Sequence, residues 1–248
     1  MNILIMAAGA VGGYFGSVLS SSNNVTFVAR GEHLLKIQES GLSVKSVTSG
    51  NYVCWSKAYK EPPPEYKADL AIFCVKEYQN EQACEIIANS ISDNTTILTL
   101  QNGLGSGEFL GQKFGSEKVV LGAAYVEASK GKPGEIVEHG GGCSITFGKQ
   151  SDIQEGRIKE LAKMFASSNV DFTVSENIHD SLWQKLVFIS ALSGMTCITK
   201  STFKEVMNNP ATRNITMNLV RETASVASEM VPNFSKDTVQ NTIDHLET

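Results

Sequence analysis

Hydrophobic and polar positions along the first 175 residues form short apolar runs that alternate with longer stretches of mixed character. Runs rich in Val, Ile and Leu predict buried strands, and apolar positions three or four residues apart predict helices. The predicted strands cover residues 2–6, 25–29, 70–75 and 96–100, with two short strands within 42–55. The predicted helices cover residues 12–20, 32–40, 80–90 and 153–167. This order predicts an α/β fold with a doubly wound, mostly parallel sheet that helices cover on both faces.

The stretch 119–147 has a different character, because its strand-like runs are separated by glycine-rich turns. The runs are Val119–Tyr125, Glu135–His139 and Cys143–Phe147, and we expect them to extend the sheet as hairpins. Val170–Val174 follows the helix predicted at 153–167 and is expected to be the last strand.

From Ile178 onward the pattern is almost wholly helical. Leu182, Leu186, Ile189 and Ser193 recur at intervals of about 3.6 residues, as positions on one face of a helix do. Further helices are expected at 215–230 and 237–246. The sequence therefore predicts a sheet domain over residues 1–175 and an all-helical domain over residues 176–248, which is short for a domain that holds a substrate.

Composition places the chain among ordinary globular proteins. Of 248 residues, 42% are hydrophobic and 19% are charged, which excludes a wholly disordered chain. The formal net charge of −5 disfavours a nucleic-acid partner bound through overall positive charge. The five cysteines form no C-x-x-C pair and the four histidines lack ligand spacing, so we expect reduced thiols and no metal site.

The apolar start of the chain is not expected to be a secretory signal. Residues 1–20 carry no Lys or Arg and contain four glycines, whereas a signal has a basic start and an unbroken apolar centre. No other segment has about 18 continuous apolar residues, so we expect no membrane span. A cytoplasmic protein is the simplest interpretation.

A glycine-rich turn follows the first predicted strand and opens a helix. Dinucleotide-binding proteins carry G-x-G-x-x-G at this place; Gly9 and Gly12 match its second and third glycines, and Ala7 replaces the first. Gly9 lets backbone amides approach a diphosphate, and Gly12 lets the helix pack close to the sheet. The predicted coenzyme-binding residues of the turn are Ala8, Gly9, Ala10, Val11 and Gly12. The alternative interpretation is an ordinary tight turn.

Arg30 follows the second predicted strand, where an acidic residue is typical of NAD-binding proteins because it accepts hydrogen bonds from the ribose 2′-hydroxyl. The chain has no acid at that strand end. An arginine there can pair with a 2′-phosphate, so the sequence predicts NADP(H) in preference to NAD(H). The alternative is an exposed arginine without a ligand.

Polar residues follow two more predicted strands. Lys76 comes after the strand at 70–75 and can offer charge to a phosphate or carboxylate. Asn102 comes after the strand at 96–100 and can bind a carboxamide or a substrate oxygen. Each residue alone could cap a helix or face solvent, but ligands of open α/β sheets bind at the carboxyl ends of strands. Together the two residues therefore favour a site.

Lys185 interrupts an apolar run in the helical part of the chain, next to Trp183 and Leu186. Such a lysine often extends its ammonium group to solvent along an apolar surface. The functional alternative is a lysine that donates a proton to a developing alkoxide while a hydride arrives from a coenzyme.

These motifs together resemble the ketopantoate reductases (2-dehydropantoate 2-reductases). The resemblance is carried by G-A-V-G at 9–12, Arg30, V-K-x-x-Q at 75–79, Q-N-G-x-G at 101–105 and L-W-x-K-L at 182–186. It spans residues 2 to about 230 in the family's order. It implies a Rossmann domain followed by a helical domain, and NADPH-dependent reduction of ketopantoate to pantoate on the way to pantothenate and coenzyme A.

The resemblance also implies a role for each matching residue. Gly9 and Gly12 would hold the diphosphate, and Arg30 would bind the 2′-phosphate. Lys76 and Gln79 would line the coenzyme side. Asn102 would contact the nicotinamide ribose or the substrate, and Lys185 would be the general acid at the 2-oxo acid. These roles define the predicted site.

The chain departs from the family's pattern at three places. Ala7 replaces the first glycine, Ile189 stands where the family usually has an asparagine that binds substrate, and Ser193 stands where a second asparagine is common. The resemblance also places the family's substrate-binding Ser and Glu beyond Thr248. Two alternatives follow: a related reductase of another 2-oxo acid, or a protein that binds NADPH without catalysis. A shortened helical domain would expose an apolar face, which predicts self-association, for example as a homodimer.

Overall fold

The computed structural model describes residues 1–232 and 234–247, and these residues divide into two compact units. The first unit contains Met1–Gln101 and Gly105–Ile178. The second contains Asn102–Leu104 and the chain from His179 onward. The domain boundary between residues 175 and 176 stays a prediction, and Thr248, the end of the predicted helical domain, lies outside the described residues.

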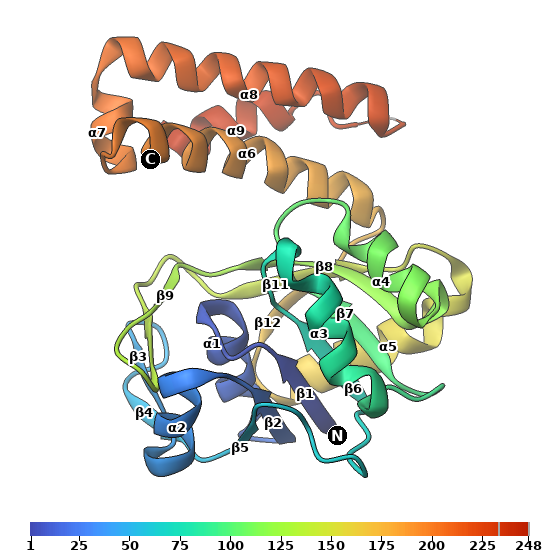
Figure 1. Ribbon diagram of the computed structural model, residues 1–248. Helices are drawn as coiled ribbons and strands as arrows, with labels where there is room; N and C mark the ends of the chain where they lie inside the picture. The colour runs from blue at the N-terminus through green and yellow to red at the C-terminus, as the bar shows by residue number, and fades with distance from the viewer. Residues whose placement is uncertain (233, 248) are drawn as a thin grey trace. The chain divides into compact units, whose positions relative to one another are not determined.

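The described residues of the first unit form an eight-stranded sheet (Figure 1). In sheet order the strands are β12 (Asp171–Val174), β11 (Ser144–Gly148), β8 (Val119–Tyr125), β7 (Thr96–Thr99), β6 (Leu70–Phe73), β1 (Asn2–Met6), β2 (Asn24–Val28) and β5 (Lys57–Tyr59). Neighbouring strands are parallel, except that β11 runs antiparallel to β8. The predicted mostly parallel sheet is confirmed, and so is the strand predicted at 170–174.

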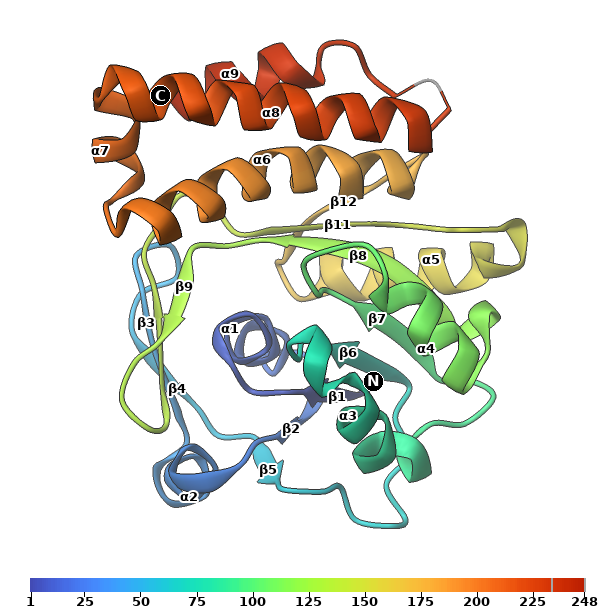
Figure 2. The same cartoon turned by 45° about the horizontal axis from the view of Figure 1, so that its top comes forward.

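A second, four-stranded sheet lies within the described part of the same unit. Its strands in order are β4 (Tyr52–Cys54), β3 (Leu42–Ser46), β10 (Glu135–Glu138) and β9 (Ala128–Lys130). The expectation that 135–139 extends the main sheet as a hairpin is therefore wrong, because β10 pairs in parallel with β3. Ile136 of β10 is fully buried where the sheet packs against helix α1 (Figure 2).

Helices connect the strands of the first unit and cover the faces of its main sheet. They are α1 (Ala10–Leu19), α2 (Gly31–Ser40), α3 (Asn80–Ile87), α4 (Ser106–Phe114) and α5 (Glu155–Ser167). Helix α4 is not among the predicted helices, because Gly107 and Gly111 lower its helix propensity. Packing explains Gly107, since a Cβ atom there would run into the side chain of Leu121 on β8.

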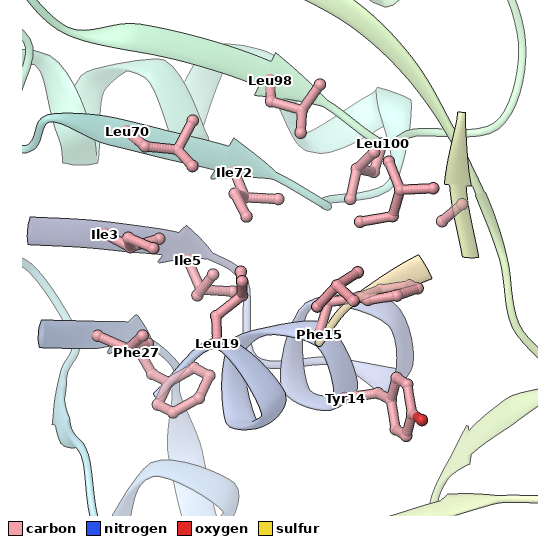
Figure 3. Close-up of a cluster of buried hydrophobic side chains, with 14 of the residues drawn as sticks. Ile3, Ile5, Tyr14, Phe15, Leu19, Phe27, Leu70, Ile72, Leu98 and Leu100 are labelled. Atoms are coloured by element: carbon pink, nitrogen blue, oxygen red, sulfur yellow. The ribbon is translucent and has the colours of Figure 1, made fainter. Parts of the chain in front are cut away.

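The strands of the main sheet are buried on both faces, as their continuous apolar runs predict. Side chains alternate along β1, so Ile3 and Ile5 join one hydrophobic cluster while Leu4 joins another on the opposite face. Figure 3 shows the first cluster, in which side chains of several strands meet Phe15 and Leu19 of α1. This packing fixes α1 against the sheet and so positions the turn that precedes it.

In the second unit the described residues from His179 onward form helices joined by short links, without strands, which confirms the predicted helical domain. Its helices are α6 (Ile178–Thr199), α7 (Phe203–Asn208), α8 (Pro210–Met230) and α9 (Thr238–Glu247). A capping box begins α7: the Thr202 hydroxyl accepts from the Glu205 amide, and the Glu205 carboxylate accepts from the Thr202 amide. Asn209 caps α8, and Pro210 occupies its first turn.

Helix α6 buries a different stripe from the one that the sequence indicates. Val187, Ala191 and Met195 are buried, and the first two pack in a cluster with residues of α8. Of the predicted positions only Leu182 is buried. Apolar residues are spread around all sides of α6, among polar ones, so the periodicity selects no single face. By length and composition alone, α6 also passes the test for a membrane span, as the core helix of a water-soluble protein can. The absence of a membrane span therefore stays a prediction.

A buried carboxylate organises the turns of the second sheet. Glu138 is 1% exposed, and its oxygens accept hydrogen bonds from the Ser46 hydroxyl at 2.6 Å and the Thr48 amide at 3.0 Å. The Thr48 hydroxyl, at 3.2 Å, and the Gly140 amide also donate to it. Burial raises the pKa of Glu138, but these hydrogen bonds outweigh it and lower the pKa to about 2.

We expect Glu138→Gln to lower the free energy of unfolding at neutral pH by about 2–4 kcal/mol, because several donors then lose a charged acceptor. The depressed pKa means that Glu138 contributes its full stability above about pH 4.5 and loses it as the pH falls through about 2. Urea unfolding at neutral pH and near pH 3 measures both effects. Glu160→Gln, on the exposed side of α5, is the control and should change neither value. Equal stability of the two variants would contradict this role.

Candidate functional site

Four adjacent parallel strands place their carboxyl ends at one edge of the main sheet. Met6 is in register with Val28 on β2 and with Phe73 on β6, and Phe73 is in register with Thr99 on β7. We call the segments that follow these strands the carboxyl edge. They are residues 7–9, 29–30, 74–76 and 100–101. The predicted residues of the first unit are thus brought to one side of the sheet.

The turn between β1 and α1 presents the start of a helix to this edge. Gly9 is the N-cap of α1, and no side-chain hydrogen bond from the described residues caps the helix. The Ala8 amide donates to the Val28 carbonyl at 2.9 Å, which ties the turn to the end of β2. The amides at the start of a helix have no acceptor within it, so those of Ala10 and Val11 can bind an anion.

Both glycines of the turn have the properties that the motif requires. A Cβ atom built on Gly9 would meet no described heavy atom within 4 Å, so the backbone there is open to a ligand. A Cβ atom on Gly12 would collide with the Ala7 carbonyl oxygen and lie 2.9 Å from Cγ2 of Ile5. Ala7, in place of the first glycine, packs its methyl group against the hydrophobic cluster around Leu4. The turn therefore fits a dinucleotide diphosphate.

Arg30 lies at the same edge as this turn. It is exposed, it directly precedes α2 as the N-cap residue, and Gly31 follows with a φ of +60°. The strand β2 ends at Val28 and is followed by the buried Ala29, so neither residue before Arg30 carries a carboxylate. The exposed guanidinium is available for a phosphate, and its pairing with one stays a prediction.

The segments after β6 and β7 carry Lys76, which is exposed, and Gln79, which is half-buried. They are tied together by Gln101, a residue to which the sequence assigns no separate role. Its Nε2 donates to the Val75 carbonyl at 2.9 Å and to Oδ1 of Asn80 at 2.8 Å. Gln101 thus fixes the end of β6 relative to the end of β7. In the sequence, the only indication of a role for Gln101 is its position next to Asn102.

Lys185 and Asn102 belong to the second unit rather than to the first. Asn102 is exposed, and Lys185 is half-buried on α6. Burial lowers the pKa of the Lys185 ammonium group to about 8, because a charged group is less stable away from water. This pKa differs from that of a lysine whose ammonium group extends into solvent, and the role of Lys185 as a general acid stays a prediction. The meeting of Lys185 with the carboxyl edge stays a prediction.

The two positions where the family has asparagines lie on the same face of α6 as Lys185. Ile189 and Ser193 follow it by four and eight residues, and such residues share one face of a helix. This is the face opposite to Val187 and Ala191, which pack into the helical core. Ile189 is half-buried and Ser193 is exposed. The face beside the lysine therefore presents an apolar side chain where an amide is expected.

The described residues contain no group of three His, Cys, Asp or Glu side chains that could hold a metal ion. The cysteines, all of which the structure describes, are free thiols. The chemistry available at these sites is therefore that of a lysine ammonium group, backbone amides, amide side chains and an arginine.

Comparison with known proteins matches both parts of the chain to one family. Residues 3–152 match the family model "Ketopantoate reductase PanE/ApbA", and residues 177–248 match its C-terminal model. The 2-dehydropantoate 2-reductase of Pyrococcus abyssi is 30% identical over 232 residues, which cover 92% of this chain and 74% of that protein.

Solved structures with the same fold agree with this match. The 2-dehydropantoate 2-reductase of Geobacter metallireducens has a TM-score of 0.92 and 29% identity, covering 100% of this chain and 82% of its own. A D-mandelate dehydrogenase in complex with NADH and anilino(oxo)acetate has a TM-score of 0.91 and 27% identity, covering 100% of this chain and 79% of its own. The chain belongs to the ketopantoate reductase family and is an oxidoreductase of the type that reduces a small 2-oxo acid with a nicotinamide coenzyme.

Proposed function

We propose that the protein reduces 2-dehydropantoate to pantoate with NADPH, the step that leads toward pantothenate and coenzyme A. The observation that carries this proposal is the carboxyl edge, where an open helix start, which no described side chain caps, and an exposed arginine follow the adjacent strands β1 and β2. A dinucleotide with a 2′-phosphate matches that pair of features. The predicted cytoplasmic location agrees with such a metabolic role.

The coenzyme would be held by residues of three segments. Residues 8–12 would bind the diphosphate, and Arg30 would bind the 2′-phosphate. Lys76 and Gln79, which follow β6, would line the side of the site that holds the coenzyme. When bound, the reduced nicotinamide supplies a hydride to the keto carbon of the substrate. The preference for NADPH rests on Arg30 and on the lack of an acid at the end of β2. The D-mandelate dehydrogenase structure contains NADH, so coenzyme choice needs its own measurement.

Lys185 would donate the proton that completes the reduction. Its pKa of about 8 leaves the amine largely protonated at neutral pH, yet makes it a stronger acid than a solvated lysine. The proton would move from Nζ to the substrate's keto oxygen, and solvent would restore it afterwards. Asn102, which belongs to the same unit, would hold the substrate or the nicotinamide ribose by hydrogen bonds.

The test is NADPH consumption in the presence of 2-dehydropantoate, with pantoate identified as the product. Turnover of this substrate above other 2-oxo acids supports the proposal. NADPH binding without turnover of any 2-oxo acid would instead identify a catalytically silent NADPH-binding protein.

A second candidate function is reduction of a less polar 2-oxo acid. Ile189 favours it, because an isoleucine supplies neither the donor nor the acceptor of an asparagine. The likeness to a D-mandelate dehydrogenase that binds anilino(oxo)acetate points to the same chemistry. A panel that contains aromatic and branched 2-oxo acids beside 2-dehydropantoate distinguishes the two candidates.

We expect Ile189→Asn to raise kcat/KM for 2-dehydropantoate about 10-fold relative to an apolar 2-oxo acid, because the amide can bind the substrate's hydroxyl group. Ile198→Asn is the matched control, since Ile198 lies on the same helix and is 79% exposed. An unchanged ratio in the Ile189 variant would place substrate discrimination elsewhere.

A further inference from the structure

His33 joins two segments that lie far apart in the sequence. It sits in the first turn of α2, and its side chain is buried. One ring nitrogen, Nε2, lies 2.8 Å from the Ala8 carbonyl oxygen, and the other, Nδ1, accepts a hydrogen bond of 2.9 Å from the Gly134 amide. Ala8 belongs to the turn after β1, whereas Gly134 directly precedes β10. The imidazole therefore connects the coenzyme turn to the second sheet.

These two contacts define the state of the ring. The Gly134 amide can only donate, so Nδ1 carries a lone pair, and Nε2 carries the proton that it donates to Ala8. Burial lowers the pKa of His33; the hydrogen bond to Ala8 acts in the opposite direction, and the charge of Lys130 adds to the lowering. The hydrogen bond from Gly134 requires the neutral ring, because Nδ1 must be unprotonated to accept it, and the lowered pKa agrees with this.

Each partner of the imidazole is itself fixed. The Ala8 amide donates to the Val28 carbonyl at 2.9 Å, so Ala8 is held through both its N–H and its C=O group. The Gly134 carbonyl accepts from the Ser43 amide at 2.8 Å. Gly134 has a φ of +77°, and a Cβ atom there would lie only 2.7 Å from Cβ of Lys36 on α2. Close packing thus brings the Gly134 turn to the histidine.

We propose that His33 is a positioning residue of the coenzyme site, which fixes the Ala8–Gly9 peptide and with it the direction of the amides that begin α1. The inference rests on the proposed binding of a dinucleotide diphosphate at this turn. Of the two contacts, the one to Ala8 controls coenzyme binding, and the one to Gly134 holds the ring in place.

Three substitutions separate the two contacts. The amide nitrogen of Gln can take the place of Nε2, so His33→Gln keeps a donor for Ala8. The amide oxygen of Asn can take the place of Nδ1, so His33→Asn keeps an acceptor for Gly134 and loses the Ala8 contact. His33→Leu loses both contacts. NADPH titration gives Kd for each variant, steady-state kinetics give KM for NADPH and kcat, and thermal unfolding without coenzyme gives Tm.

We expect the Asn and Leu variants to raise Kd and KM for NADPH about 5- to 10-fold, with little change in kcat, because one hydrogen bond that orients the turn is lost. The Gln variant should bind within about 2-fold of the unchanged protein by the same scale. Equal Kd in all variants, or Kd values that follow Tm and not the presence of the Ala8 donor, would overturn the inference. If the Leu variant does not fold, comparison of the Gln and Asn variants still shows whether the Ala8 contact controls coenzyme binding. Failure of the unchanged protein to bind NADPH would refute the proposed function instead.

Discussion

Lys185→Met is expected to reduce kcat for the 2-oxo acid about 100- to 10,000-fold, the usual contribution of a general acid, while Kd for NADPH changes little. Methionine keeps an unbranched side chain of similar size on the half-buried face of α6, and its neutral thioether has no proton to donate. Stopped-flow measurement of NADPH consumption and titration of NADPH give the two values. Lys204→Ala, an exposed lysine on α7, is the control and should keep full turnover.

The pH dependence of turnover gives a second result for the same residue. The acid form of Lys185 is lost as the pH rises through about 8, so kcat for reduction should fall above that pH. Lys185→Arg keeps the positive charge but cannot release a proton in this range, so it should stay slow at every pH. Normal turnover in the Met or Arg variant would show that another group donates the proton.

Arg30→Ala is expected to weaken NADPH binding about 10- to 100-fold and to leave NADH binding nearly unchanged, because charged hydrogen bonds to a 2′-phosphate are available to only one of the two coenzymes. Arg30 is exposed, so its loss should not disturb the fold. Titration of each coenzyme into both proteins measures the preference directly. NADH serves as the internal control.

The opposite outcome of that titration is equally informative. If the unchanged protein binds NADH as tightly as NADPH, the sequence argument from the end of β2 fails. If Arg30→Ala weakens both coenzymes alike, the arginine acts on a group that the two share, such as the diphosphate.

The sequence predicts those parts of the fold in which the local pattern of apolar residues matches the way the strand is buried. The strands β1 and β6 are continuous apolar runs that alternate with predicted helices, which is the pattern of a parallel sheet covered on both faces. The partner strand of β10 could not be predicted from the apolar pattern, because the pairing of β10 with β3 joins segments about 90 residues apart. Hydrophobic period describes one strand and carries no information about its neighbour.

The residues of the candidate site also fall into those that the sequence could predict and those that it could not. Gly9, Arg30 and Lys76 could be found because each lies shortly after the end of a strand, and parallel strands bring such residues to one edge. Gln101 and His33 could not be assigned, because their importance depends on contacts with backbone groups elsewhere in the chain. The buried stripe of α6 could not be predicted for a further reason: its polar residues are scattered among the apolar ones and form no single polar face to mark the exposed side.

A single-turnover experiment tests the central claim most directly: NADPH is bound to the protein, 2-dehydropantoate and a panel of other 2-oxo acids are added separately, and the coenzyme and products are quantified. We expect one equivalent of bound NADPH to be oxidised for each equivalent of 2-hydroxy acid formed, with at least one of these acids. NADPH that fails to bind, or that binds and persists unoxidised with every 2-oxo acid, would contradict the account.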